Sequence, residues 1–116
     1  MTRLAPLTAL AIVALLSPGA EAQEVSQVEL EAFVEQVKSC WTIAPADIGS
    51  GRSVKLRVAL ALDGAVTDAS VIDPDKSEAA QRLATGAIRA VERCAPYSFS
   101  AESYDVWKTL EVDLQP

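Results

Sequence analysis

Apolar and polar residues alternate most regularly between Ser53 and Leu62, which predicts a β-strand there. The apolar positions recur every second residue, at Val54, Leu56, Val58, Leu60 and Leu62. One face is therefore aliphatic and the other polar, as in a strand that lies on a core with its second face toward water. The Asp63-Gly64 pair that follows predicts a hairpin turn and a return strand from about Val66 to Ile72.

The register of this return strand has two solutions. A two-residue loop would turn inward Ala65, Thr67, Ala69 and Val71. A bulged three-residue loop would turn inward Val66 and Ile72, together with Asp68 and Ser70. The sequence pattern is compatible with both.

Helical spacing of apolar residues before the hairpin predicts a first helix from about Gln27 to Trp41. Ser26 is the expected N-cap, and Glu29 stands at the third helical position, as in a capping box. The apolar stripe contains Leu30, Phe33, Val34, Val37, and Cys40 or Trp41. A connector from Thr42 to Gly51, rich in proline, glycine and serine, is expected to be a loop.

A second helix is expected directly after the hairpin. Asp73 can cap it, Pro74 suits its first position and Asp75 favours a helix N-terminus, while Pro96 ends it. Its apolar face contains Ala80, Leu83, Ala84, Ala87, Ile88, Val91 and Cys94. The opposite face carries Arg82, Thr85, Arg89 and Glu92.

A last strand is predicted from Tyr104 to Leu114. The inward positions are Val106, Leu110, Val112 and Leu114, with Lys108 interrupting the alternation, and the outward positions are Trp107, Thr109, Glu111 and Asp113. The outward acids would complement Lys55 and Arg57 on the first strand, and a helical crossover makes the last strand antiparallel to the first. The sequence therefore predicts an α+β domain with a three-stranded antiparallel sheet in the order 2-1-3 and helices on one face.

Residues 1–22 have the pattern of a secretory signal peptide. Arg3 precedes an uncharged apolar run from Leu4 to Leu16, and Ala20-Glu21-Ala22 resembles a cleavage site. The run is shorter than the roughly 20 residues of a membrane-spanning helix. We expect cleavage before Gln23, which leaves residues 23–116 as one exported domain; an uncleaved anchor is the alternative.

An exported chain with two cysteines favours a disulfide between them. Cys40 and Cys94 both lie at the C-terminal ends of the predicted helices, on the apolar stripes. A bond there would join two elements across the core. It would stabilise the fold by roughly 4 kcal/mol at most, through the entropy of the unfolded chain.

The amino-acid composition of the chain argues against several classes of function. The chain of 116 residues has a formal net charge of −6, which argues against nucleic-acid binding. It has no histidine, which excludes Ser-His and Cys-His catalytic pairs and most catalytic zinc sites. Asp73 and Asp75 are not followed by the glycine and glutamate of a calcium loop. We therefore expect no catalytic residue, no metal and no cofactor.

Four short segments of the sequence resemble those of a known protein family. They are Cys40-Trp41, "VALALDGAV" from Val58 to Val66, "AIRAVERCAPY" from Ala87 to Tyr97, and "YDVWK" from Tyr104 to Lys108. With the order of predicted elements, they resemble the C-terminal domain of the TonB/TolA group, in its TolA branch. The resemblance covers roughly Leu30 to Pro116, and its cysteine pair corresponds to Cys40 and Cys94.

The resemblance implies a non-enzymatic, periplasmic protein-interaction module of the Tol-Pal cell-envelope system in a Gram-negative bacterium. Its partners would be periplasmic or outer-membrane-associated proteins, Tol-Pal components among them, that add a strand to an edge of the sheet. The candidate partner-binding residues are Trp107, Thr109, Glu111 and Asp113, although the arms of Lys55 or Arg57 offer another explanation for an outward Trp107. A TonB-like energy-transduction accessory domain and a small periplasmic inhibitor or binding protein are the alternatives. We expect no permanent membrane anchor.

Overall fold

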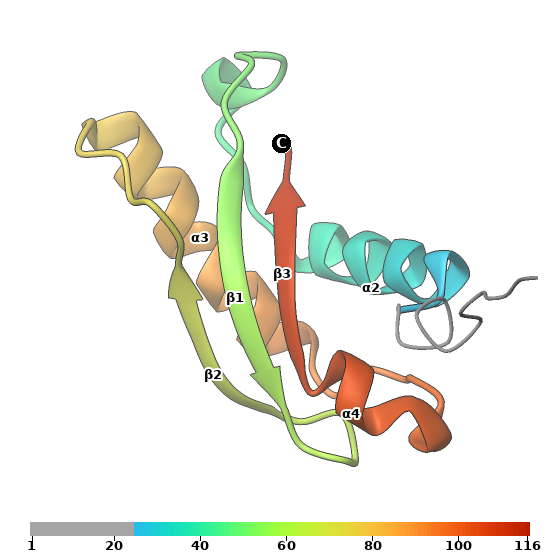
Figure 1. Ribbon diagram of the computed structural model, residues 1–116. Helices are drawn as coiled ribbons and strands as arrows, with labels where there is room; N and C mark the ends of the chain where they lie inside the picture. The colour runs from blue at the N-terminus through green and yellow to red at the C-terminus, as the bar shows by residue number, and fades with distance from the viewer. Residues whose placement is uncertain (1–24) are drawn as a thin grey trace, which may run out of the picture.

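The computed structural model describes residues 25–116, so the predicted signal peptide lies outside the described residues. In chain order the elements are α2 (Gln27–Cys40), the 3₁₀ turn η1 (Pro45–Asp47), β1 (Val54–Leu60), β2 (Val66–Val71), α3 (Glu78–Cys94), the 3₁₀ turn η2 (Ala101–Ser103), α4 (Tyr104–Trp107) and β3 (Thr109–Leu114). The strands form one antiparallel sheet in the order β2-β1-β3, with α2 and α3 behind it (Figure 1). This is the predicted α+β architecture. Between residues 25 and 116, every helix is too short or too polar to cross a membrane.

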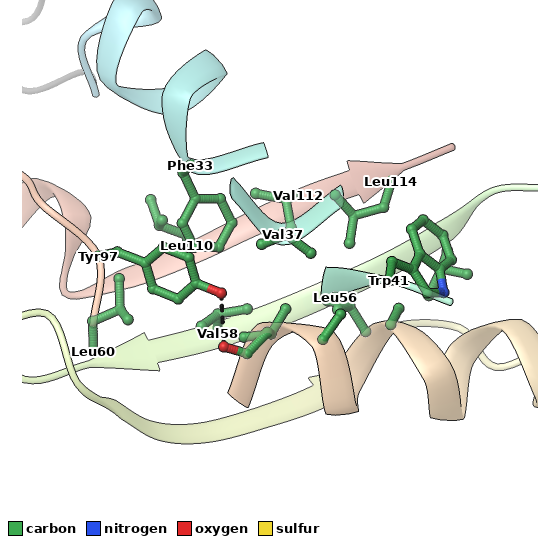
Figure 2. Packing of buried hydrophobic residues seen from close by; sticks show 14 of the residues in the cluster. Phe33, Val37, Trp41, Leu56, Val58, Leu60, Tyr97, Leu110, Val112 and Leu114 are labelled. Carbon is green, nitrogen blue, oxygen red and sulfur yellow. Dashed lines mark hydrogen bonds between the residues drawn. The ribbon is translucent and has the colours of Figure 1, made fainter. Parts of the chain in front are cut away.

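The core lies between the helices and one face of the sheet (Figure 2). β1 and β3 bury every second side chain, as their alternation predicts. The buried strand residues are Val54, Leu56, Val58, Leu60, Leu110, Val112 and Leu114. The helical layer adds Phe33, Val37, Trp41, Leu83, Ala87, Ala90 and Val91. The alternating residues of the strands and the apolar stripes of the helices therefore pack together in a single two-layer core.

The N-terminus of α2 keeps half of the predicted capping box. The Ser26 hydroxyl accepts a hydrogen bond from the Glu29 backbone N–H at 3.4 Å. The Glu29 carboxylate does not reach back to the cap. It accepts instead from the Ser100 backbone N–H at 2.8 Å and from the Ser100 hydroxyl at 2.9 Å, and so attaches α2 to the segment before η2.

The hairpin combines parts of both expected registers. Ala69 lies opposite Val58, while Val66 lies opposite Leu60, because a bulge shifts the register between these pairs. The strand β1 ends earlier than predicted. The turn closes with a hydrogen bond from the Ala61 N–H to the Ala65 carbonyl at 2.8 Å, so Leu62 lies inside the loop and is 61% exposed. The predicted inward position of Leu62 is wrong for this reason.

The second helix begins later than its predicted cap at Asp73. α3 starts at Glu78, and Ser77 is its N-cap, with its hydroxyl accepting from the Ala80 N–H at 3.2 Å. Asp73 has a φ of 50°, in the left-handed region. Asp75 accepts from the Ser77 N–H at 2.9 Å. The two aspartates therefore shape the turn that precedes the helix, and the prediction of Asp73 as helix cap is wrong.

The first part of the predicted last strand is helical. β3 begins only at Thr109, and Trp107 is 1% exposed instead of lying on the outward face. Its indole stacks on Phe99 with ring centroids 5.0 Å apart, and its Nε1 donates to the Ser100 carbonyl at 2.7 Å. In the helical turn of α4 this large side chain is buried with its N–H satisfied, as is usual for a buried indole. Lys108, which interrupts the alternation, lies where helix changes to strand.

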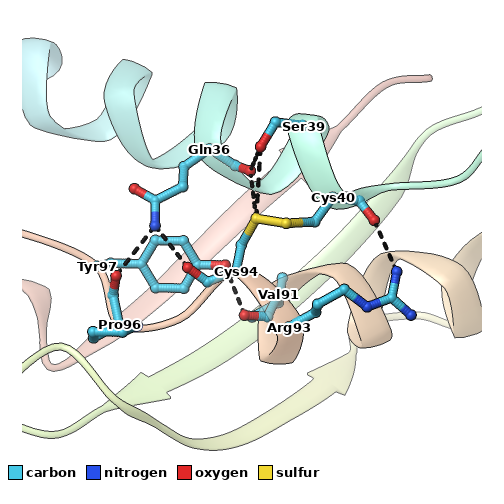
Figure 3. Close-up of a disulfide and its surroundings, with 8 residues drawn as sticks. All are labelled: Gln36, Ser39, Cys40, Val91, Arg93, Cys94, Pro96 and Tyr97. Atoms are coloured by element: carbon cyan, nitrogen blue, oxygen red, sulfur yellow. Dashed lines mark hydrogen bonds between the residues drawn. A yellow bond between two sulfur atoms is a disulfide. The ribbon is translucent and has the colours of Figure 1, made fainter.

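Cys40 and Cys94 form a disulfide that joins the C-terminal ends of α2 and α3, with their Cα atoms 6.0 Å apart (Figure 3). Hydrogen bonds flank it on both sides. The Gln36 side-chain amide donates to the carbonyls of Cys94 at 2.7 Å and of Pro96 at 3.1 Å. Arg93 donates to the Cys40 carbonyl at 3.4 Å. The two helix ends are therefore held together by one covalent bond and by carbonyl contacts in both directions.

Tyr97 connects the end of α3 to the hairpin. Its hydroxyl donates to the Val91 carbonyl at 2.7 Å, and its backbone N–H donates to the Gly64 carbonyl at 2.9 Å. Gly64 has a φ of +88°, and a Cβ there would collide with the Tyr97 carbonyl. The Tyr97 ring packs on Phe33 with centroids 4.5 Å apart. Burial of the ring raises the pKa of Tyr97 to about 12.

A candidate strand-docking edge

β3 is an edge strand whose ladder uses only alternate backbone groups. The ladder begins where the Leu60 N–H donates to the Lys108 carbonyl at 2.8 Å. In an antiparallel pair the hydrogen-bonded positions recur every second residue. In the observed register, the β3 residues that bond to β1 are therefore Leu110, Val112 and Leu114. The residues that turn their N–H and C=O groups to the open side are Thr109, Glu111 and Asp113, and we call these three the β3 edge.

The open side of β3 is uncovered in the part of the chain that the structure describes. The sheet ends at β3, and no element between residues 25 and 116 pairs with its outer side (Figure 1). The three edge residues are exposed. An uncovered edge of this kind is a template for an added strand.

The side chains of the β3 edge lie on the outer face of the sheet, next to the cations of β1. Arg57 donates to one Glu111 carboxylate oxygen through Nε at 3.1 Å and through Nη2 at 2.7 Å. Lys55 lies directly opposite Asp113 in the register. The predicted charge complementarity between the two strands is therefore confirmed. The ion pair draws the Glu111 side chain toward β1 and away from the open side.

A shallow hollow of about 380 Å³ adjoins the edge on the outer face. Its lining contains Lys55, Ile72, Asp73, Glu111, Val112 and Asp113. The hollow thus combines two aliphatic residues, Ile72 and Val112, with charges of both signs. It offers a place for a side chain of an added strand, where backbone pairing alone would give little selectivity.

The other edge of the sheet, β2, is less regular. Thr67 is the extra residue of the bulge, and its hydroxyl donates to the Ala59 carbonyl at 3.1 Å. A bulge bends and twists a strand, which makes its edge a poorer template for an added strand. β3 has a continuous register with β1 from Thr109 to Leu114. Regularity therefore favours β3 over β2 as the docking edge.

The short helix α4 fixes the start of β3. The Tyr104 hydroxyl donates to the Leu60 carbonyl at 3.1 Å, and the Lys108 N–H donates to the Tyr104 carbonyl at 2.8 Å. Tyr104 also meets Trp107 edge to face, with ring centroids 4.9 Å apart. Trp107 therefore supports the edge from inside the fold and does not lie on it. The sequence carried a signal for this turn, because Lys108 breaks the alternation directly after two aromatic residues spaced three apart.

The chemistry offered by this edge is hydrogen bonding by backbone groups. Across residues 25–116, no group of three or more His, Cys, Asp or Glu side chains is arranged to hold a metal ion. No catalytic arrangement is built from the three edge residues, whose side chains are a threonine hydroxyl and two carboxylates on an exposed surface.

Comparisons with known proteins bear on the fold. No family model matches the chain, and no curated protein matches it. Among solved structures, it is similar to the solution NMR structure of TolAIII bound to a peptide derived from the N-terminus of TolB. The TM-score is 0.61 at 22% sequence identity, over 80% of this chain and 76% of the other. The fold is TolAIII-like. This confirms the fold expected from the resemblance to the TolA branch.

Proposed function

We propose that this chain is a non-enzymatic protein-interaction module that binds an extended segment of a partner protein along the β3 edge. The observation that carries the proposal is the row of backbone N–H and C=O groups at Thr109, Glu111 and Asp113 that the register turns to the uncovered side. A partner strand would satisfy these groups with main-chain hydrogen bonds. The similar structure, TolAIII, is bound to a peptide derived from the N-terminus of TolB, which supports a peptide segment as the ligand class.

We infer that the module acts in the periplasm of a Gram-negative bacterium, with Tol-Pal components among its candidate partners. The signal-peptide pattern of residues 1–22 and the disulfide between Cys40 and Cys94 support an oxidising, exported location. Two acids on the β3 edge, in a chain with a net charge of −6, favour a basic or neutral partner segment.

The test uses two substitutions at one position. Glu111→Pro removes the outward N–H and leaves the ladder to β1 intact, because Glu111 belongs to the residues that face away from β1. Glu111→Ala removes the same side chain and the same ion pair with Arg57 but keeps the N–H. Both variants should remain folded by circular dichroism, since the ion pair is exposed and is worth at most about 1 kcal/mol.

The assay captures partners from a periplasmic extract on immobilised native protein and identifies them by mass spectrometry. We expect the alanine variant to capture the same partner as the native protein and the proline variant to lose it. If a folded Glu111→Pro variant captures that partner as well as the native protein does, strand addition at the β3 edge is wrong.

A further inference from the structure

A second surface lies on the helical layer and shares no residue with the β3 edge. A groove of about 650 Å³ runs along α3, beside the segment that follows α2. Three arginines line it, Arg82, Arg89 and Arg93, with a single acid, Glu78, at the same surface. This concentration of positive charge is unusual in a chain whose net charge is −6.

The three arginines form one row along the helix. Arg82, Arg89 and Arg93 are separated by seven and four residues, so at about 100° per residue they lie within about 40° of one line. At a rise of about 1.5 Å per residue, the row is about 16 Å long. A row of this length fits a chain molecule with several negative charges better than it fits one small anion.

Hydrogen bonds within the fold hold Arg82 and Arg93 in place, but only Arg82 is paired with an acid in the described part of the chain. Arg82 donates to both carboxylate oxygens of Asp47, at 3.1 and 3.0 Å, and Asp47 is only 5% exposed. Arg93 donates to the carbonyl of Cys40, next to the disulfide (Figure 3). Among residues 25–116, neither Arg89 nor Arg93 has a carboxylate within ion-pair distance. Two guanidinium charges therefore face the groove without a counter-charge.

A buried tryptophan side chain packs against Gly86, one of the residues that line the groove. Trp41 is 6% exposed, and its buried Nε1 finds no hydrogen-bond partner among residues 25–116. Figure 2 shows this nitrogen turned toward α3. On α3 it meets Gly86, which lines the groove, and a Cβ at Gly86 would lie 3.2 Å from Nε1. The missing side chain at Gly86 therefore lets the indole pack closely against α3, where its N–H is closed off from solvent. A buried donor without a partner is rare in native proteins.

We propose that this groove binds an extended acidic peptide segment of a partner protein. Side chains on one face of an extended chain recur about every 6.6 Å, which is close to the rise of about 6 Å between Arg89 and Arg93. Carboxylates at alternate positions of the segment then meet Arg89 and Arg93, the two arginines without an acidic partner among the described residues. The Trp41 indole, which packs against Gly86 beneath this surface, then lies close to the bound segment. The site is thus a second docking surface, with the opposite charge preference to the β3 edge.

The test measures fluorescence anisotropy of a short labelled peptide that alternates serine and glutamate, with a serine–glutamine peptide as its uncharged match. We expect the glutamate peptide to bind, with an affinity that falls as salt is added, and the glutamine peptide not to bind. The double substitution Arg89→Gln and Arg93→Gln should weaken binding by about tenfold, since exposed ion pairs contribute modestly. The matched control, Lys38→Gln with Lys108→Gln, makes the same change in net charge at residues that do not line the groove and should leave the affinity within about twofold.

The two tryptophans locate the bound peptide. In amide NMR spectra the indole N–H signal of Trp41 should shift when the glutamate peptide is added, whereas that of Trp107, which is bonded to Ser100, should not. The Glu111→Pro variant should bind the glutamate peptide as the native protein does, which separates this site from the β3 edge. Equal binding of both peptides, equal binding by the arginine and lysine variants, or binding of phosphatidylglycerol vesicles without binding of the peptide would each overturn the proposal.

Discussion

Tyr97 makes the stability of this fold depend on pH in the alkaline range. The side chain is 3% exposed, and burial raises its pKa from 10.0 to about 12. In the unfolded chain the phenol ionises near pH 10, as in a model peptide. Between about pH 10 and pH 12 the unfolded state has therefore released this proton while the folded state still holds it. The free energy of unfolding falls across that window and is unaffected by this group below it.

The size of the effect follows from the pKa difference. Two pKa units correspond to about 2.7 kcal/mol once the pH exceeds 12, and to about 1.4 kcal/mol at pH 11. A Tyr97→Phe variant has no proton to release, so it lacks this loss. It also lacks the hydrogen bond of 2.7 Å to the Val91 carbonyl, which costs it about 1 kcal/mol at pH 8. The native protein should therefore be the more stable of the two at pH 8, and the two should be equally stable near pH 11.

The assay is urea unfolding followed by circular dichroism at pH 8, 9.5 and 11, on both proteins with the disulfide intact. All other side chains are identical in the two proteins, so their contributions cancel in the difference. If the difference in unfolding free energy between native protein and Tyr97→Phe is the same at pH 8 and pH 11, the reasoning about the buried phenol is refuted.

Three further predictions concern stability. Replacing Cys40 and Cys94 by alanine should lower the free energy of unfolding by about 2–4 kcal/mol, and equal denaturation midpoints for oxidised and reduced native protein would contradict this. Trp107→Ala should cost about 3–5 kcal/mol because the indole is buried, and a thermal-unfolding difference below about 1 kcal/mol would mean that the residue lies at the surface. Gly64→Ala should cost on the order of 2–3 kcal/mol because a left-handed backbone and a collision with a neighbouring carbonyl act together. Gly49→Ala is its control and should cost only about 1 kcal/mol, since Gly49 has a similar φ with open space around it.

The elements with long, regular periods could be predicted from the sequence. β1 alternates over its whole length, and α2 has a cap and a stripe that agree, so local pattern and tertiary packing demand the same structure. Short segments were harder. Around Trp107 an alternating pattern suggested a strand, but the free energy of burying one indole outweighs the weak preference of a few residues for an extended chain.

The N-cap of the second helix was predicted wrongly for a related reason. Asp73 and Pro74 are good helix-start residues, but Ser77 is equally suitable and leaves room for the turn that leads out of β2. The choice between them depends on where the chain must go next, which local sequence does not encode.

Only part of the candidate site, the β3 edge, could be predicted from the sequence. The outward side chains at Thr109, Glu111 and Asp113 follow from the alternation, whereas the direction of their backbone groups depends on how β3 pairs with β1. The arginine groove on α3 likewise has one feature that the sequence predicts and one that depends on tertiary packing. The spacing of its arginines can be read from the sequence, but the contact between Gly86 and the Trp41 indole depends on how the end of α2 packs on α3.

The acids on the β3 edge also determine how this protein meets copies of itself. An open edge can pair with the same edge of another molecule, which is a common route to aggregation. In an antiparallel pairing centred on Glu111, that carboxylate would face its own copy, and each Asp113 would lie nearby on the same surface. Like charges directly opposite each other on paired strands are destabilising. Concentrated protein at low salt should therefore keep its edges apart, and added salt should weaken that protection by screening the repulsion.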